Sequence, residues 1–293
     1  TARTSPLLHV SQAAGLGLYD VKASCFMRDI LEKNGVEPAF LPPVTDEFAV
    51  LGSFRGIPVS VSIGDNQASF LGSVREARRD LLVNIGTGSQ ISVLSDEYAE
   101  GNGIEARPFT KGSCLLVGAA LCGGSAYAML ERFFREYAVA VGGADVPQYE
   151  VMKRLLESSD SARVQTCQAD KLTVRTTFAG TRENPQETGS ITGIRTDNFH
   201  PAALIRGVLE GMADELYGLY RVIERESGFS GTRLVASGNG VRKNTALQAI
   251  LQERFGMPLE IVPYEEEAAF GAAISSLAAI GRLSVEQWLG LNR

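Results

Sequence analysis

Short apolar runs that each end in small residues beside a polar side chain constrain the fold of this chain more than any other feature. From residue 57 to the C-terminus these runs alternate with segments of helical period. The apolar residues over 59–63, 81–85, 89–94 and 115–121 have the length and composition of strands. Strands that alternate with helices predict an α/β fold, in which helices pack on a mixed sheet.

The later part of the chain carries the clearest helical pattern. Residues 201–228 place apolar side chains on one face at helical spacing, namely Ile205, Val208, Leu209, Met212, Leu216 and Leu219. The same patterns predict further elements: helices over 125–137 (with Ser125 as the N-cap), 147–156, 244–255 and 266–279, and strands over 233–236 and 259–262. The glutamates at 265–267 are interpreted as a solvated helix start.

Residues 1–55 differ from the rest of the chain. They predict only a short strand over 16–19, a helix over 26–31 and an extended segment at Leu41-Pro42-Pro43. This stretch holds too little apolar material to form a core of its own. We therefore expect 1–55 to be the tail of an N-terminal lobe that is otherwise missing, and 56–293 to form a C-terminal lobe.

Composition and charge argue against several classes of function. A net charge of −6 opposes a nucleic-acid partner, which requires a basic face. The longest apolar stretch, 114–122, is too short to cross a bilayer, so no membrane partner is expected. Four cysteines without a C-x-x-C pair, and only two histidines, favour reduced thiols in the cytoplasm over a metal centre. Both histidines lie outside the motifs below, so carboxylates must do any acid–base work.

The segment Gly64-Asp65-Asn66-Gln67 follows directly after a predicted strand. Glycine lets the chain turn there and present Asp65 at the end of the strand. An aspartate in such a place can orient a hydroxyl group and accept its proton late in phosphoryl transfer. The alternative is that Asp65 caps the helix that follows, since aspartate is a favoured N-cap.

Gly86-Thr87-Gly88 lies between two predicted strands. Backbone N–H groups and the Thr87 hydroxyl of such a hairpin can hold phosphate oxygens. A simple tight turn is the alternative, because glycines between strands often mean only that. The short distance along the chain from Asp65 favours the phosphate loop.

Two further glycine-rich points complete the set. Gly123 and Gly124 open a predicted helix, whose free N–H groups would attract an anion, although close packing of that helix would also require glycine. Gly238-Asn239-Gly240, followed by Asn244, offers a flat backbone and a helix N-terminus to a purine nucleotide. A strand-to-helix loop that needs positive φ is the alternative there.

With these loops in this order, the chain resembles the FGGY carbohydrate kinases, which share the ribonuclease-H-like fold of actin and hexokinase. The similarity runs from about Leu16 to the C-terminus. It rests on Gly64-Asp65-Asn66-Gln67-Ala68, Gly86-Thr87-Gly88, Gly207-Val208-Leu209-Glu210-Gly211, Gly238-Asn239-Gly240 and Glu267-Ala268-Ala269-Phe270-Gly271-Ala272-Ala273. Within the family, residues 66–69 and 238–244 look most similar to sedoheptulokinase-like members.

The resemblance implies ATP-dependent phosphorylation of a sugar or polyol hydroxyl, with a ketose such as sedoheptulose as the expected acceptor. Asp65 corresponds to the catalytic aspartate and is also the expected metal contact, and Asp65 and Asn66 are the expected sugar contacts. ATP and Mg²⁺ are the implied cofactors. The remaining correspondences are to nucleotide contacts: Gly86, Thr87 and Gly88 in the γ-phosphate loop, Gly123 beside it, and Gly238, Asn239, Gly240 and Asn244 around the adenosine.

Two departures from the family pattern affect these expectations. Asn239 replaces the middle one of three consecutive glycines, which puts the detailed purine contacts in doubt. No amino-terminal G-x-D-x-G-T phosphate loop is present. The expected partner is therefore the missing N-terminal lobe of the same protein, without which the chain is expected to be inactive. A homodimer is left open.

Other functions stay open at this point. The chain could be a nucleotide-binding module without turnover, because half of the expected site is lacking. It could also be an ATPase or a kinase for another acceptor on the same fold, similar to acetate kinase or to a chaperone.

Overall fold

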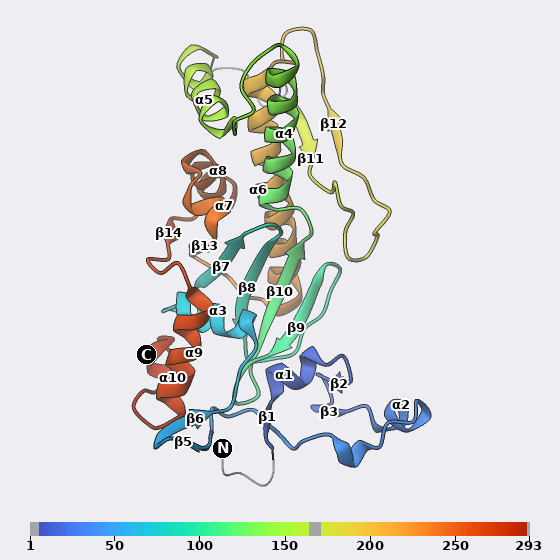
Figure 1. The fold of residues 1–293 in the computed structure, drawn as a ribbon, viewed down its shortest axis with the longest axis vertical. Coiled ribbons are helices and arrows are strands. Elements are labelled where there is room, and N and C mark those ends of the chain that lie inside the picture. The colour runs from blue at the N-terminus through green and yellow to red at the C-terminus, as the bar shows by residue number, and fades with distance from the viewer. Residues whose placement is uncertain (1–5, 164–170, 292–293) are drawn as a thin grey trace.

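A mixed sheet of six strands forms the centre of the molecule (Figure 1). This computed structural model describes residues 6–163 and 171–291. Across the sheet the order is β14 (Leu259–Ile261), β13 (Arg233–Ser237), β7 (Asp80–Ile85), β8 (Ser89–Ser95), β10 (Cys114–Ala120) and β9 (Ile104–Pro108). The first three strands run parallel, and the pairs from β7 to β9 are antiparallel. The predicted α/β fold with a mixed sheet is confirmed.

Alternating side chains of β7 divide the core between the two faces of the sheet. Leu81, Val83 and Ile85 pack in the core of one face, and Leu82 packs in the core of the other. The first face is covered by α4 (Gly124–Ala140), α6 (Pro201–Ser227) and α8 (Thr245–Phe255). The second is covered by α3 (Asp65–Ser73), α9 (Glu267–Ala279) and α10 (Val285–Trp288). The sheet is therefore the middle layer of three.

Local capping explains why the long helix was predictable to within a residue. The His200 side chain accepts a hydrogen bond from the Ala203 N–H at 3.3 Å, and Pro201 is the first helical residue. Gly228 ends α6 in the left-handed conformation, with φ of 69°. None of the helices in the two described ranges is long and apolar enough to span a membrane.

Several predicted bounds differ from the structure. Ser125 is not an N-cap, because α4 begins one residue earlier and Gly123 takes that position. The strand predicted over 59–63 is β6 (Ile57–Ser60), which pairs with β5. It ends earlier than predicted because the chain then turns toward the start of α3. The helix predicted over 147–156 is α5 (Tyr149–Arg163). Strand β9 was not predicted, and neither were β11 (Thr173–Arg175) and β12 (Ser190–Thr192) within the irregular stretch.

The N-terminal part forms a small satellite beside the main sheet (Figure 1). It contains β1 (Leu8–His9), α1 (Val10–Gly15), β2 (Tyr19–Asp20), β3 (Cys25–Phe26), α2 (Arg28–Lys33), the 3₁₀ turn η1 (Pro38–Phe40) and β4 (Val44–Thr45). Among its described residues, the core cluster contains three buried side chains, Val10, Ala13 and Tyr19, on which partly buried apolar residues pack. Strand β5 (Val50–Phe54) then pairs with β6, so a hairpin joins this part to the segment that leads into α3.

Helices α3 and α9 approach each other through their backbones. A Cβ atom on Gly72 would lie 2.2 Å from the Glu267 carbonyl oxygen, and one on Gly271 would lie 1.8 Å from the Ala68 carbonyl oxygen. Only glycine fits at such distances, since the obstructing atoms belong to a backbone that cannot rotate away. This close crossing determines how α3 is placed relative to α9.

We predict that Gly271→Ala lowers the free energy of unfolding by about 1–3 kcal/mol, because the added methyl group forces the two helices apart. Gly218→Ala in α6 is the matched control, since a Cβ there meets nothing within 4 Å, and it should stabilise by about 0.5–1 kcal/mol. Urea unfolding of the two variants measures both effects. A Gly271→Ala variant as stable as the wild type would contradict the close crossing.

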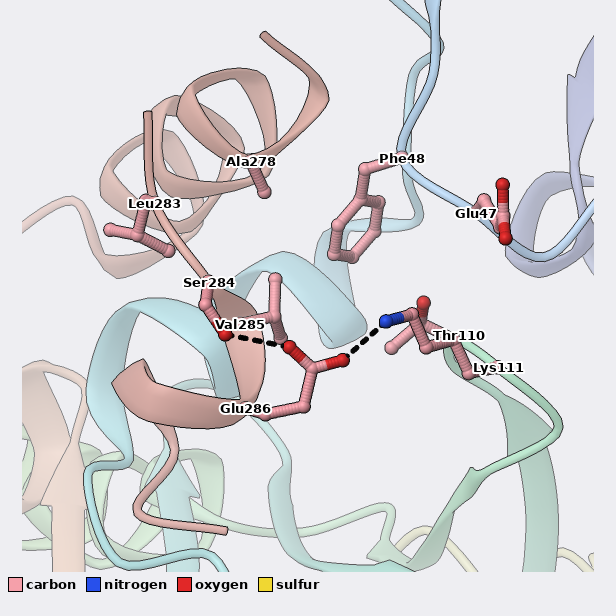
Figure 2. A pocket seen from close by; sticks show the side chains of 9 residues that line it. All are labelled: Glu47, Phe48, Thr110, Lys111, Ala278, Leu283, Ser284, Val285 and Glu286. Carbon is pink, nitrogen blue, oxygen red and sulfur yellow. Dashed lines mark hydrogen bonds and ion pairs between the residues drawn. The ribbon is translucent and has the colours of Figure 1, made fainter. Parts of the chain in front are cut away.

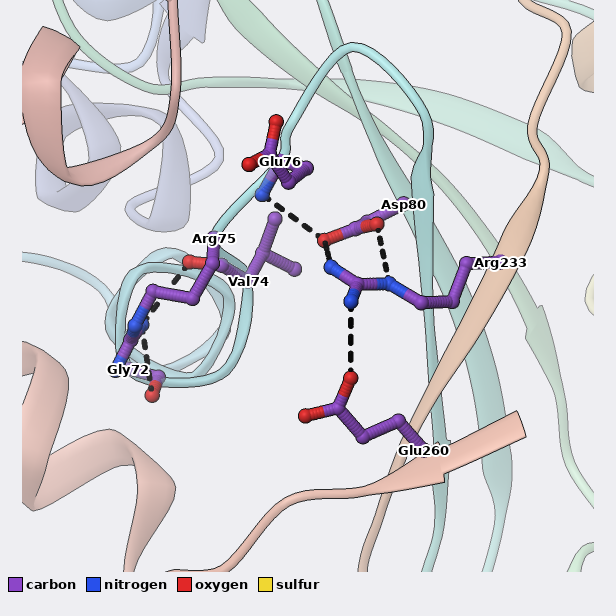
Figure 3. Close-up of polar contacts among 7 residues, drawn as sticks. All are labelled: Gly72, Val74, Arg75, Glu76, Asp80, Arg233 and Glu260. Atoms are coloured by element: carbon purple, nitrogen blue, oxygen red, sulfur yellow. Dashed lines mark hydrogen bonds and ion pairs between the residues drawn. The ribbon is translucent and has the colours of Figure 1, made fainter. Parts of the chain in front are cut away.

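A buried ion pair locks β7 to β13 (Figure 3). Asp80, whose side chain is fully buried, accepts hydrogen bonds from Arg233 Nε at 2.9 Å and Nη2 at 2.7 Å. Arg233 also reaches Glu260 on β14 at 3.0 Å, and the Glu76 N–H donates to Asp80 at 3.0 Å. The hydrogen bond to Asp80 raises the pKa of Arg233. Since Arg233 and Asp80 are also register partners, the pair specifies how the parallel strands align.

Arg233→Met should lower the free energy of unfolding by about 3 kcal/mol, because it leaves the Asp80 carboxylate buried without its cation. Arg78→Ala breaks an exposed pair with Asp96 and should cost less than about 1 kcal/mol. Thermal or urea denaturation distinguishes the two. Equal losses in both variants would show that the buried pair does not anchor β7.

Candidate active site

A cavity of about 460 Å³ lies where β7 ends and β8 begins. It is lined by Asp65 and Asn66 from the start of α3 and by Gly86, Thr87 and Gly88 from the β7–β8 turn. The structure thus brings these predicted residues, from two separate motifs, to one cavity. The lining does not include the other predicted residues, which are Gly123, Gly238, Asn239, Gly240 and Asn244.

Asp65 is the first residue of α3, and its side chain is exposed at the cavity. The N-cap of the helix is Gly64, which has an extended conformation, so Asp65 does not take the capping position that the sequence left open. One carboxylate oxygen accepts the N–H of Asn66 at 2.7 Å. An accessible carboxylate is thereby available on the cavity wall.

The β7–β8 turn is a tight hairpin that leaves its outer surface open. The Gly86 N–H donates to the Gly88 carbonyl at 3.0 Å, while Gly86 and Thr87 are exposed. A Cβ atom on Gly86 would meet nothing within 4 Å. The hairpin therefore has room beside its backbone for a ligand, as the phosphate-loop interpretation requires.

The N–H groups of the first residues of α4 have acceptors in the β7–β8 hairpin, so these groups are not open to the anion predicted at Gly123. Gly124 donates to the Gly86 carbonyl at 2.8 Å, and Gly123 and Ser125 both donate to the Thr87 carbonyl at 3.0 Å. The carbonyl groups of the hairpin need donors, and the helix supplies them. A Cβ on Gly123 would lie 2.3 Å from the Gly88 oxygen, so glycine serves close packing here.

The Gly238-Asn239-Gly240 segment packs against the same hairpin from the other side of β7. A Cβ on Gly238 would lie 2.5 Å from the Ile85 oxygen, and one on Gly240 would lie 2.8 Å from the Ile85 side chain. Gly238 has φ of 89° and precedes α7 (Asn239–Arg242), so the predicted loop is the first turn of a short helix. Asn244 caps α8 by accepting the Leu247 N–H at 3.0 Å.

The cavity is also lined by polar residues that the sequence motifs did not reveal. Asn66 Nδ2 donates to Gln90 Oε1 at 3.1 Å. Gln90 pairs with Asn84 on β7 and with Ala119 on β10, so these positions share one face of the sheet. The signal that could have found Gln90 is its position as the second residue of the predicted strand that follows the hairpin.

Two arginines on the cavity wall share a single carboxylate. Arg107 Nη2 and Arg182 Nη1 lie 2.5 Å and 3.0 Å from Glu105 Oε1. Burial alone would raise the pKa of Glu105, but the hydrogen bond and charge of Arg107, with those of Arg182, lower it. Glu105 is therefore ionised and neutralises only one of the two guanidinium groups.

Buried polar atoms beside the cavity fit a polar ligand. Asn66 Oδ1 and Ser89 Oγ are buried and have no hydrogen-bond partner among the described residues. Both residues line the cavity. Buried polar groups in native proteins are normally paired, so unpaired ones at a cavity are consistent with a ligand or water that completes them.

A second cavity of about 250 Å³ lies between Phe48, the Thr110–Lys111 loop and the α9–α10 segment (Figure 2). On its wall, Lys111 Nζ donates to one carboxylate oxygen of Glu286 at 2.5 Å, and Ser284 Oγ donates to the other at 2.7 Å. Hydrogen bonds from Lys111 and Ser284 lower the pKa of Glu286 to about 2. The cavity at the β7–β8 turn is the candidate active site, because it brings two of the predicted motifs together.

Comparison with known proteins matches this chain to one family. Residues 81–280 match the model of the C-terminal domain of the FGGY family of carbohydrate kinases. The chain is 23% identical over 290 residues to sedoheptulokinase from Mus musculus, covering 93% of the chain and 58% of that protein. It is 26% identical over 313 residues to glycerol kinase 2 from Saccharolobus solfataricus, covering 99% and 56%. The chain thus spans little more than half the length of these relatives.

Solved structures show the same fold. The xylulose kinase from Rhodospirillum rubrum superposes with a TM-score of 0.80 at 19% identity, covering 98% of this chain and 58% of that one. The glycerol kinase from Plasmodium falciparum with ADP gives 0.78 at 17% identity, covering 98% and 57%. The predicted actin and hexokinase type of fold is confirmed. The chain belongs to the FGGY family of carbohydrate kinases and contains the C-terminal domain of that family.

Proposed function

We propose that this chain supplies the nucleotide-binding lobe and the catalytic base of an ATP-dependent kinase that phosphorylates a sugar or polyol hydroxyl. The observation that supports this most directly is that Asp65 and the Gly86–Gly88 hairpin line one cavity. Phosphoryl transfer needs little covalent chemistry from a protein; it needs a donor and an acceptor held in line and charge stabilised between them. An exposed carboxylate and an open glycine hairpin on one cavity provide these elements.

In the proposed reaction, the acceptor oxygen forms a bond to the γ-phosphorus of ATP, and the bond between that phosphorus and the β–γ bridging oxygen breaks. ADP leaves with the electron pair of the broken bond, and a phosphate ester remains. Asp65 orients the acceptor hydroxyl and accepts its proton as the new bond forms. Asn66, whose amide already bonds Gln90 on the cavity wall, is the proposed second contact to the acceptor.

The nucleotide would lie along the hairpin and the segment that packs behind it. Thr87 and Gly88 would bind the terminal phosphates through backbone N–H groups and the Thr87 hydroxyl. Gly86, whose N–H already donates to the Gly88 carbonyl, would leave the open space in which a phosphate lies. Gly238, Asn239 and Gly240 would lie beside the adenosine, since their backbone abuts Ile85 just before the hairpin. Gly123 and Asn244 are the remaining proposed nucleotide contacts; the N–H of Gly123 already donates to Thr87, and Asn244 Oδ1 already accepts the Leu247 N–H.

The donor set also fits a magnesium ion. The described residues contain no group of three or more His, Cys, Asp or Glu side chains that could hold a metal, and Mg²⁺ commonly binds one or two carboxylates together with substrate phosphates. Asp65 is the proposed protein ligand. When bound, Mg²⁺ supplies charge neutralisation on the phosphate oxygens.

The rest of the site is proposed to come from a preceding lobe. Residues 1–55 would be the tail of that lobe and 56–293 the C-terminal lobe, joined by the β5–β6 hairpin. Closure of the two lobes would exclude water, which competes as phosphoryl acceptor. We propose a ketose such as sedoheptulose as the acceptor, in the cytoplasm; the sedoheptulokinase relatives support this choice.

For the chain on its own, a nucleotide-binding module without turnover is the second candidate, and the short span relative to its relatives favours it. Calorimetry with ATP and a coupled assay for ADP release separate the two. Binding without sugar-dependent ADP release identifies the module. Sugar-dependent release by the chain alone would show that no second lobe is needed.

In the full-length protein, Asp65→Asn should lower kcat by about 10²–10⁴-fold, because the amide cannot accept the acceptor proton. The Kd for ATP should change much less than kcat, since the hairpin is the proposed direct contact to the phosphates and Asp65 would reach them only through the magnesium ion. Steady-state kinetics and calorimetry give the two numbers. Asp96→Asn, an exposed aspartate elsewhere, is the matched control. Normal turnover by Asp65→Asn would refute the assignment of the base.

Gly86→Ala should leave the fold intact, because the methyl group enters open space. It should weaken ATP binding by about tenfold or more, since that space is the proposed place of a phosphate and tenfold corresponds to about 1.4 kcal/mol. Thermal denaturation and calorimetry test the two parts. Unchanged ATP affinity in a stable Gly86→Ala protein would exclude the hairpin as the phosphate loop.

A further inference from the structure

Helix α1 holds the two residues that precede Asp65. Ser11 Oγ accepts the Gly64 N–H at 2.9 Å, across 53 positions of sequence. Gln12 Nε2 donates to the Ile63 carbonyl at 2.9 Å, across 51 positions. These contacts come from a different part of the chain than α3, so they restrain the start of α3 independently of its packing on α9.

A buried histidine orients the Ser11 hydroxyl. His9 is completely buried, its ring stacks on Phe48 at 5.4 Å, and its Nδ1 lies 2.7 Å from Ser11 Oγ. The Ser11 N–H also points to Nδ1, at 3.3 Å, so that nitrogen is the acceptor and the proton is on Nε2. Ser11 Oγ then donates to His9, which leaves its lone pairs for the Gly64 N–H.

The His9 imidazole is neutral at neutral pH. Burial lowers the pKa of His9 to about 4, against the opposing charge of Asp46. A neutral ring with Nδ1 as acceptor keeps the same hydrogen-bond direction at neutral pH. The orientation of Ser11 is therefore fixed.

The residue that Ser11 of α1 holds, Gly64, also determines the position of Asp65. Gly64 is the N-cap of α3, and its carbonyl accepts the Ala68 N–H at 2.9 Å. A Cβ atom at Gly64 would lie 2.4 Å from Gln67 Oε1, so the backbone there is closely surrounded. Since Asp65 is the next residue, a shift of Gly64 moves the carboxylate directly.

We propose that Ser11, oriented by His9, and Gln12 are positioning residues that hold the Asp65 carboxylate at its place on the cavity wall. The inference rests on the proposed function, in which Asp65 is the base. Displacement of a reacting group by about 1 Å can cost up to about 100-fold in rate. Loss of either contact should therefore lower kcat while binding of ATP at the hairpin is retained.

The test uses the full-length protein with Ser11→Ala, which removes the acceptor for the Gly64 N–H, and Gln12→Glu, which keeps the side-chain shape but cannot donate. Each should lower kcat by about tenfold, and KM for ATP should stay within about twofold. Ser275→Ala removes a hydroxyl that is equally buried but bonds within α9, so it should leave both constants unchanged. Thermal denaturation confirms that each variant is folded at the assay temperature.

A double variant distinguishes positioning from a general loss of stability. Because Ser11 acts through Asp65, Ser11→Ala should lower the residual kcat of Asp65→Asn by less than about twofold, whereas independent effects would multiply. If Ser11→Ala fails to fold, Gln12→Glu with Asp65→Asn serves the same cycle.

Three outcomes would overturn the inference: kcat within twofold of wild type in folded Ser11→Ala and Gln12→Glu, a parallel loss in Ser275→Ala, or multiplicative effects in the cycle. Full turnover by Asp65→Asn alone would instead contradict the proposed function. The two failures are therefore distinguishable.

Discussion

Backbone-to-backbone packing of α3 on α9 is the contact on which the candidate site depends. Gly72 and Gly271 allow carbonyl oxygens of the partner helix to approach where any side chain would collide, and α3 carries Asp65 at its first position. Helix α9 also contacts α7, because Arg242 Nη2 of α7 donates to Glu267 Oε1 of α9 at 3.4 Å. One helix thus joins the carboxylate to the proposed adenosine segment, and displacement of α9 would disturb both.

The opposite wall of the cavity gains its rigidity from hydrogen bonds rather than from packing alone. Both carbonyl groups of Gly86 and Thr87 accept N–H donors from the start of α4. The hairpin is therefore held by α4 through its carbonyl groups, while the space beside Gly86 stays open. Preorganised dipoles of this kind stabilise developing charge without rearrangement during the reaction. The N-terminus of α4 thereby orients the proposed phosphate loop.

The sequence predicted the elements whose signals are local and missed the contacts that only the fold creates. Hydrophobic period and terminal caps located β7, β8 and α6 almost to the residue. Strand β9 was missed because Ile104–Pro108 alternates only briefly between apolar and polar residues. Glu267, interpreted as solvated, is buried, and Arg242 from another helix pairs with its carboxylate. The motifs supplied Asp65 and Thr87, whereas Gln90 and Arg182 reach the cavity through strand register and a long loop.

A crystal structure of the full-length protein with a non-hydrolysable ATP analogue, Mg²⁺ and an acceptor sugar tests the central claim most directly. The account predicts that the γ-phosphate contacts the backbone N–H groups of the Gly86–Gly88 hairpin, and that an acceptor hydroxyl lies within hydrogen-bond distance of the Asp65 carboxylate. A nucleotide bound away from the hairpin, or an Asp65 side chain turned from both ligands, would contradict it.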